Sequence, residues 1–185
     1  MSKVLVPLAI GFEEIEAVSI IDVLRRAGIE VIVAAVSLEI TVQGANGIII
    51  KADKYLNEVD EESLDMIILP GGWGGTDILA VDKTVQNIIK KMNKKNKLIG
   101  AICAAPFALD KAGVLPKEFT CYPSVEEKIN NKGYIEGKSV VEYGNIITSR
   151  GPGTSICFGL QIVKKLKGEE IYSQLKEGLL SKFCE

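Results

Sequence analysis

Runs of hydrophobic residues alternate with amphipathic segments along almost the whole chain. Continuous apolar runs are typical of strands buried on both faces, and they lie at residues 3–9, 29–37, 64–75 and 97–102. The third run ends in the glycine-rich loop PGGWGG. Apolar residues at helical spacing predict helices over residues 13–28, 83–96, 104–113, 153–168 and 169–182. In the first of these helices the apolar stripe consists of Ile15, Val18, Ile21 and Leu24.

Two further segments predict paired strands. One is a hairpin over residues 39–53, in which β-branched runs flank a Gly-Ala-Asn-Gly turn, and the other is a strand pair over residues 140–149. Buried strands that alternate with helices predict a parallel sheet covered on both faces. We therefore expect one doubly wound α/β domain spanning residues 1–185, with a sheet that the inserted hairpin makes mixed.

Functional sites in such folds gather at the carboxyl ends of the strands. This rule places residues 13–16, 71–75 and 150–153 together with Cys103 at one edge of the sheet. The candidate chemistry of the chain is therefore expected at that edge.

The composition is that of an ordinary soluble protein, with 47% hydrophobic and 25% charged residues. Basic and acidic residues are interspersed and the net charge is −2, so we expect no nucleic-acid partner. No apolar run approaches the roughly 20 residues of a membrane span, and the apolar start of the chain leads into acidic residues and not into a cleavage site. We expect a cytoplasmic protein with no membrane partner.

The four cysteines are widely spaced and form no C-x-x-C pair, and the chain contains no histidine. A zinc site or any other metal site is therefore not expected. A disulfide framework is also unexpected in a chain with a normal core. The sequence thus predicts four free thiols, namely Cys103, Cys121, Cys157 and Cys184.

The stretch LIGAICAAPFAL places Cys103 between a predicted strand and a predicted helix. Ala101 and Ala105 flank it at the spacing of a nucleophile elbow, a sharp turn that tolerates only small neighbours. A helix N-terminus there would favour the thiolate. A buried cysteine that merely fills the core fits the same pattern, so both interpretations stay open.

Three other motifs carry two interpretations each. The loop PGGWGG is either a tight turn or a cradle whose N–H groups face an oxyanion beside Cys103. Glu16, one turn into the first helix among apolar neighbours, is either a helix-dipole partner or a buried carboxyl that exchanges protons. Arg150, in SRGPGTS, either binds an anion or ties its loop to carbonyl groups.

Taken together, EEIE, DVLRRAG, LPGG, AICAAP and TSRGPGTS resemble, in order and position, the ThiJ/PfpI family and its DJ-type, deglycase-like branch. The resemblance covers nearly the whole chain. It implies a flavodoxin-like α/β sandwich that forms a homodimer. Cys103 would be an oxidation-prone nucleophile of low pKa, Glu16 its protonated carboxyl partner, and the N–H groups of Gly72 and Ala104 the oxyanion site.

The sequence departs from the family pattern at two positions. Tyr122, in TCYPS, stands where many members carry histidine, and Asn46, in GANG, stands where many carry arginine. Both are expected near the pocket or the dimer interface, together with Arg150. Related peptidases and amidotransferases use a Cys–His pair, and a chain without histidine cannot form one, which argues against both activities.

The resemblance implies two alternative functions. The first is a cofactor-independent glyoxalase or deglycase that acts on small 2-oxoaldehydes or glycated protein. The second is a non-enzymatic redox sensor or stress chaperone that works through oxidation of Cys103. Ile15, which is apolar at a helix start, and the apolar hairpin are expected to form the two-fold contact of the dimer.

Overall fold

The computed structural model describes residues 2–184, and a seven-stranded sheet forms its centre. The sheet order is β5-β2-β1-β6-β7-β9-β8. These strands are β1 (Lys3–Leu8), β2 (Glu30–Ala35), β5 (Lys54–Tyr55), β6 (Met66–Leu69), β7 (Leu98–Ile102), β8 (Val140–Tyr143) and β9 (Ile146–Ser149). All neighbours pair in parallel except β8 and β9.

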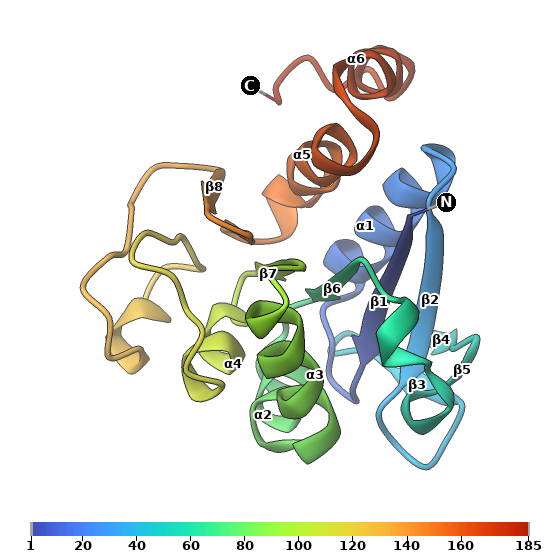
Figure 1. The fold of residues 1–185 in the computed structure, drawn as a ribbon, viewed down its shortest axis with the longest axis vertical. Coiled ribbons are helices and arrows are strands. Elements are labelled where there is room, and N and C mark those ends of the chain that lie inside the picture. Colours follow the sequence, from blue (N-terminus) through green and yellow to red (C-terminus); the bar gives the residue numbers. More distant parts are fainter. Residues whose placement is uncertain (1, 185) are drawn as a thin grey trace.

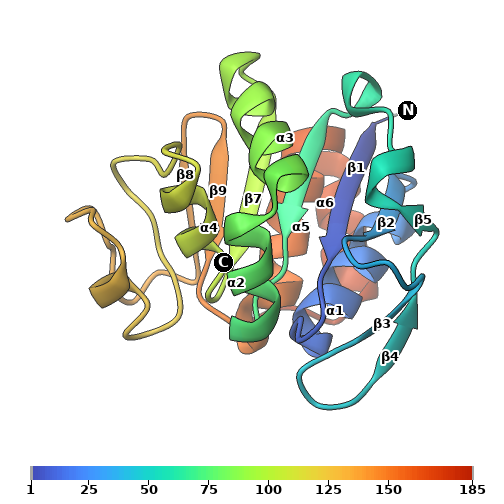
Figure 2. The same ribbon diagram turned by 90° about the horizontal axis from the view of Figure 1, so that it is seen from below.

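Helices cover both faces of the sheet, as Figures 1 and 2 show from two directions. One face carries α1 (Glu14–Arg26), α5 (Ser155–Lys167) and α6 (Glu169–Gly178), and the other carries α2 (Trp73–Val81), α3 (Lys83–Lys94) and α4 (Pro106–Lys111). Each layer buries its own hydrophobic cluster against the sheet. The predicted doubly wound α/β architecture is therefore confirmed.

The hairpin differs from the expectation in one respect. Its strands β3 (Thr41–Gln43) and β4 (Ile49–Lys51) form a separate two-stranded sheet, so the hairpin does not make the main sheet mixed. The antiparallel strand β8 does so instead. The hairpin is held to α1 because the Glu14 carboxylate accepts hydrogen bonds from the Asn46 N–H (2.6 Å) and the Asn46 side-chain amide (2.9 Å).

The apolar stripe expected along α1 is only partly buried. Ile21 and Leu24 lie in the core, whereas Ile15 is 58% and Val18 is 48% exposed. The helix begins at Glu13, whose carboxylate accepts a hydrogen bond from the Glu16 N–H at 2.7 Å. Ile15 and Val18 thus leave an uncovered apolar row on the outer face of the helix.

The expectation of four free thiols is wrong for two of them. Cys157, near the start of α5, and Cys184, after α6, form a disulfide with a Cα–Cα distance of 5.1 Å. Wide spacing in the sequence argued against pairing, but α6 folds back along α5 and brings the two ends together. Cys103 and Cys121 remain free and buried.

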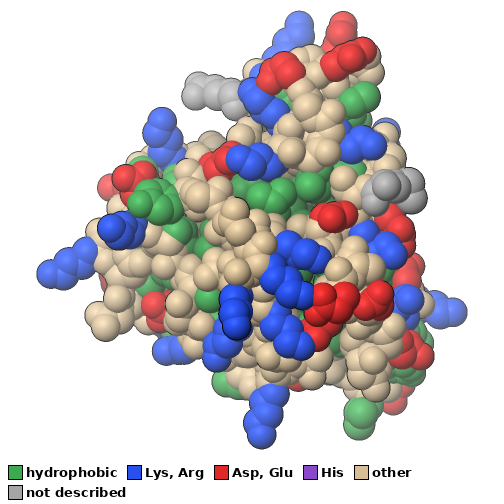
Figure 3. Space-filling model, in the orientation of Figure 1, with side chains coloured by type: hydrophobic (Ala, Val, Ile, Leu, Met, Phe, Trp, Pro, Cys, Tyr) green, Lys and Arg blue, Asp and Glu red, His purple; other side chains and the backbone are tan. Residues whose placement is uncertain are grey.

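Oppositely charged side chains lie next to one another on the surface over α3, as Figure 3 shows. Here Lys91 pairs with Glu61 and Lys95 with Glu62. Within residues 2–184, no helix combines the length and the apolar character needed to cross a membrane.

The sheet order reverses direction between β1 and β6, since the chain builds β1, β2 and β5 outward and then returns to place β6 on the other side of β1. The carboxyl ends of β1, β6 and β7, three neighbouring parallel strands, therefore lie at the same edge of the sheet, where sites in such folds gather. The segments that follow these strands carry Glu16, Gly72 and Cys103 respectively.

Candidate active site

Cys103 occupies a strained turn between β7 and α4. Its φ angle is +63°, a left-handed conformation that side chains other than glycine rarely adopt. The backbone is pinned on both sides: the Cys103 N–H donates to the Ser149 carbonyl at 2.9 Å, and the Cys103 carbonyl accepts from the Tyr122 N–H at 3.0 Å. This geometry is that of a nucleophile elbow.

Two glycines after β6 allow the backbone to pass close to Cys103. A Cβ on Gly71 would lie 2.6 Å from both the Cys103 Cβ and the Glu16 Oε2, so any side chain there would occupy the space that these groups share. Gly72 has a φ of +86°, and a Cβ on it would lie 2.7 Å from the Glu13 nitrogen. The loop PGGWGG is therefore a close-approach element and not only a turn.

Glu16 is fully buried and points from α1 to this space. Its Oε2 accepts a hydrogen bond from the Gly71 N–H at 2.8 Å, while Oε1 has no hydrogen-bond partner among the described residues. Burial raises the pKa of Glu16 to about 7, although hydrogen bonds with Cys103 and Gly71 lower it in part. Glu16 can therefore hold or release a proton near neutral pH.

The low pKa expected for Cys103 is not what the geometry gives. Burial raises the pKa of the Cys103 thiol above its ordinary value, and the neighbouring Glu16 carboxylate raises it further. The N–H groups of Gly72 and Ala104 act in the opposite direction and lower this pKa in part. Both predicted donors thus face the sulfur, but the thiol and the carboxyl compete for protons as one coupled pair.

The other predicted residues take different places. Tyr122 is half exposed and lies against Gly151, beside the carbonyl of Cys103. Asn46 lies in the hairpin turn, and its side-chain amide donates a hydrogen bond to the Glu14 carboxylate of α1. Burial raises the pKa values of Cys121 and Tyr134, and the charge of Arg150 opposes this increase in part, so Arg150 acts on these two groups. The structure therefore joins Cys103, Glu16, Gly72 and Ala104, with Tyr122 adjacent.

Sequence reasoning placed residues 71–75 at this edge but missed the particular roles of several residues around the site. Ser149 supplies only a backbone carbonyl to the elbow, which no side-chain pattern signals. Gly71 separates Glu16 from Cys103, and Trp73 begins α2, a helix that the glycine-rich sequence did not predict. The second free thiol, Cys121, lies 3.8 Å from the Glu126 carboxylate, and burial together with this carboxylate raises its pKa to about 12.

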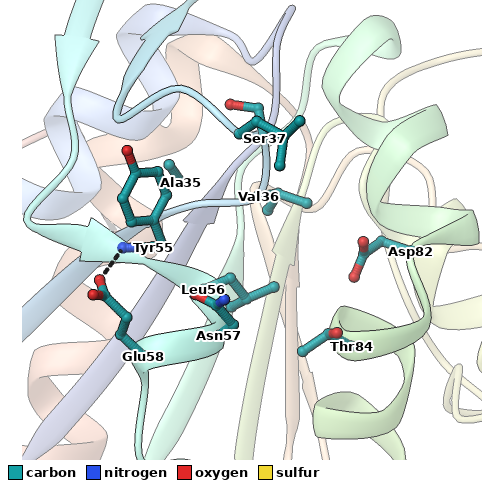
Figure 4. A pocket seen from close by; sticks show the side chains of 10 residues that line it. Ala35, Val36, Ser37, Tyr55, Leu56, Asn57, Glu58, Asp82 and Thr84 are labelled. Carbon is teal, nitrogen blue, oxygen red and sulfur yellow. Dashed lines mark hydrogen bonds between the residues drawn. The ribbon is translucent and has the colours of Figure 1, made fainter.

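A separate pocket of about 410 Å³ lies between the end of β2 and the start of α3 (Figure 4). Its two carboxylates accept hydrogen bonds from nearby backbone groups: Glu58 accepts from the Tyr55 N–H, and Asp82 accepts from the Val85 N–H. Within residues 2–184, no group of three acidic, cysteine or histidine side chains has the geometry of a metal site.

The sequence pattern of the DJ-1/PfpI family matches residues 2–165 of this chain. The chain belongs to the DJ-1/PfpI family. Protein dj-1beta of Drosophila melanogaster is 42% identical over 183 residues, which cover 97% of this chain and 98% of that protein. The crystal structure of Drosophila DJ-1beta superimposes with a TM-score of 0.94 at 42% identity, covering 97% of this chain and 98% of that one.

Two other relatives add information, one through its greater length and the other through a name that states an activity. Protein DJ-1 homolog B of Arabidopsis thaliana is 43% identical over 96% of this chain, but the match spans only 41% of that longer protein. A Caenorhabditis elegans protein named glutathione-independent glyoxalase DJR-1.2 is 40% identical, covering 90% of this chain and 89% of that protein. The family and its flavodoxin-like fold are thus established for this chain.

The raised pKa of Glu16 predicts a defined pH dependence of stability. Between about pH 4.5 and 7 the folded protein keeps a proton on Glu16 that the unfolded chain has lost, so this contribution is complete below pH 4.5 and disappears as the pH rises through 7. Relative to Glu16→Gln, the unfolding free energy of the wild type should fall by about 3 kcal/mol over this range.

Urea unfolding at a series of pH values measures this difference. Glu177→Gln, which removes an exposed carboxyl, is the matched control and should follow the wild type. A constant difference between wild type and Glu16→Gln from pH 4.5 to 7.5 would contradict the assignment.

Proposed function

We propose that this protein is a cofactor-independent glyoxalase that converts 2-oxoaldehydes, such as methylglyoxal, to 2-hydroxy acids. The observation that carries the proposal is the buried Glu16 carboxyl beside Cys103, at an elbow where the Gly72 and Ala104 N–H groups face the sulfur. The name of the Caenorhabditis elegans relative supports the same reaction class. Glycated protein is a further substrate of this type, because it carries the hemithioacetal or aminocarbinol formed from the same aldehydes.

The first step is addition of the Cys103 sulfur to the aldehyde carbon. Glu16 takes the thiol proton as the C–S bond forms and passes it to the former carbonyl oxygen, which becomes the hydroxyl of a hemithioacetal and leaves Glu16 as a carboxylate. A pKa of about 7 suits this exchange at neutral pH, because the carboxylate accepts the proton without holding it irreversibly. The N–H groups of Gly72 and Ala104 stabilise the charge that develops on oxygen.

The second step moves a proton between two carbons. Glu16 removes the proton from the carbon bound to sulfur, which gives an enediol, and a proton returned to the neighbouring carbon yields a thioester. Water then cleaves the thioester, releasing the 2-hydroxy acid and restoring the Cys103 thiol. The net reaction adds one water to the 2-oxoaldehyde, so the electrons balance within the substrate and no redox cofactor is required.

A redox role is the second candidate, and a specific feature favours it. Glu16 Oε1 is buried without a hydrogen-bond partner among the described residues, and the Gly72 and Ala104 N–H groups face the same sulfur. These groups match a cysteine sulfinate, whose oxygens accept two N–H bonds and one bond from a protonated carboxyl. Under this alternative two equivalents of peroxide oxidise the Cys103 thiol to the sulfinate and are themselves reduced to water, and this oxidised protein is the end state with no turnover of aldehydes.

We also propose that the chain forms a homodimer through α1 and the hairpin. Glu14, next to Ile15, accepts hydrogen bonds from the Asn46 and Ile48 N–H groups and so holds the start of α1 against the hairpin. The exposed apolar side chains of these adjoining elements are Ile15 and Val18 on α1 and Ile48 and Ile49 on the hairpin. All four apolar side chains are between 48% and 63% exposed. Apolar surface of this kind at adjoining elements is typical of a self-complementary contact.

Turnover of methylglyoxal tests the proposed reaction. Cys103→Ala should abolish lactate formation, and Glu16→Gln should lower kcat by on the order of 10²-fold, because the amide keeps the shape of the carboxyl but transfers no proton. Glu177→Gln should retain wild-type activity. Full activity of Cys103→Ala would contradict the proposal, and activity of Glu16→Gln within a few-fold of wild type would assign proton transfer to another group, with Tyr122→Phe as the next variant.

Sedimentation velocity tests the dimer. The wild type should sediment as a dimer at tens of micromolar, and Ile15→Lys should shift it to monomer because the contact would bury an unpaired ammonium. Leu38→Lys places the same charge at a 95% exposed leucine outside this surface and should leave the dimer intact. A monomeric wild type would refute the proposed contact.

A further inference from the structure

Four side chains outside the proposed reaction form an aromatic and cationic cluster on the segments that flank the Cys103 elbow. The rings of Trp73 and Phe107 meet edge to face, with centroids 5.6 Å apart. The Lys128 ammonium lies 4.6 Å from the Trp73 ring centroid, and the Lys111 ammonium lies 4.6 Å from that of Phe107. We call Trp73, Phe107, Lys111 and Lys128 the aromatic rim.

The rim is carried by the segments that build the site. Trp73 follows Gly72, whose N–H faces the Cys103 sulfur. Phe107 lies on the first turn of α4, four residues after Cys103. Lys128 ends the short segment 126–128, and this stretch of chain is anchored to the elbow because the Tyr122 N–H donates to the Cys103 carbonyl. The rim therefore stands at the same sheet edge as the nucleophile.

The two ammonium groups are held but not neutralised. Among residues 2–184, no ion pair joins Lys111 or Lys128 to a carboxylate, whereas Lys91 pairs with Glu61 and Lys95 pairs with Glu62. Glu126, the acidic residue two positions from Lys128, lies against Cys121. A lysine seated on an aromatic face keeps its full charge and is restricted in position. Such a group is available to an anion that approaches this edge of the sheet.

We propose that the aromatic rim makes the site selective for 2-oxoaldehydes that carry an anionic group, a carboxylate or a phosphate. The proposal rests on the glyoxalase function argued above and names its substrate class. Lys128 attracts the anion, and Trp73, which is 38% exposed, fixes the lysine and offers a flat surface to the carbon chain. Lys128 and Trp73 act in specificity, while Cys103 and Glu16 perform the chemistry on neutral and anionic aldehydes alike.

Alkylation of Cys103 tests the rim without requiring turnover. Iodoacetate and iodoacetamide react by the same displacement, differ in charge and are similar in size, so the ratio of their rates reports the attraction of a carboxylate. Lys128→Met should lower the iodoacetate-to-iodoacetamide ratio by about fivefold. The matched control Lys132→Met removes an equal charge from an exposed lysine that lies over no aromatic ring of residues 2–184, and it should leave the ratio unchanged.

A pair of substrates supplies the second arm and distinguishes phosphate from carboxylate. For 3-hydroxy-2-oxopropanal, the phosphorylated form should have a higher kcat/KM than the neutral form in the wild type, and Lys128→Met should lower only the former, by about fivefold. Loss of preference in one arm alone identifies the anion that the rim recognises.

The outcomes separate the two proposals. The role of the rim would be overturned if Lys128→Met kept the wild-type alkylation ratio and the wild-type kcat/KM preference. It would also be overturned if Lys132→Met changed them as much as Lys128→Met does. Either result would leave the glyoxalase function intact. Charge-selective alkylation without turnover of either aldehyde would instead overturn the glyoxalase function and with it the substrate class. A Cys103 that reacts with neither reagent and turns over neither aldehyde would overturn both.

Discussion

The close approach of Glu16 to Cys103, with Gly71 between them, is the constraint on which the rest of the site depends. Burial favours the protonated form of both groups, which share one small space. Among residues 2–184, the Gly71 N–H is the only backbone donor bonded to the Glu16 carboxylate. Only glycine fits at position 71, because a Cβ would lie 2.6 Å from both partners. The pair can therefore exchange a proton near neutral pH. The proposed glyoxalase reaction depends on movement of this proton and not on permanent ionisation of the Cys103 thiol.

The fold supplies this contact from elements far apart in the sequence. Glu16 comes from α1, Gly71 and Gly72 from the loop after β6, and Cys103 from the turn after β7, and the reversal of sheet order between β1 and β6 brings them together. The strained φ of +63° at Cys103 persists because Ser149 and Tyr122 hold its N–H and carbonyl. Side-chain identity at Tyr122 is thus separable from its backbone role, and this explains how the elbow forms although the family histidine is absent.

Sequence periodicity was sufficient for the main strands and helices, because buried parallel strands and amphipathic helices impose strong patterns. The same argument placed Cys103, Glu16 and Gly72 at one edge. It failed where tertiary packing decides: the Cys157–Cys184 disulfide depends on α6 folding back along α5, and α2 forms in spite of its glycines. The direction of the Cys103 pKa shift was also predicted wrongly. The position of Cys103 at a helix start indicates N–H groups that lower the pKa, but the sequence does not show that burial and the neighbouring Glu16 carboxylate raise it. Glu14 could have been recognised only from the hairpin turn that it holds.

The central claim is that Glu16 holds a proton near neutral pH and shares it with Cys103. Carbon-13 NMR of the side-chain carboxyls, with Glu16→Gln used to assign the resonance, measures this directly. The account predicts a Glu16 pKa of about 7 in the wild type and a higher value in Cys103→Ala, because the hydrogen bond with Cys103 lowers the pKa of the carboxyl. A Glu16 resonance that titrates near the ordinary value of 4.5, or one that Cys103→Ala leaves unchanged, would contradict it.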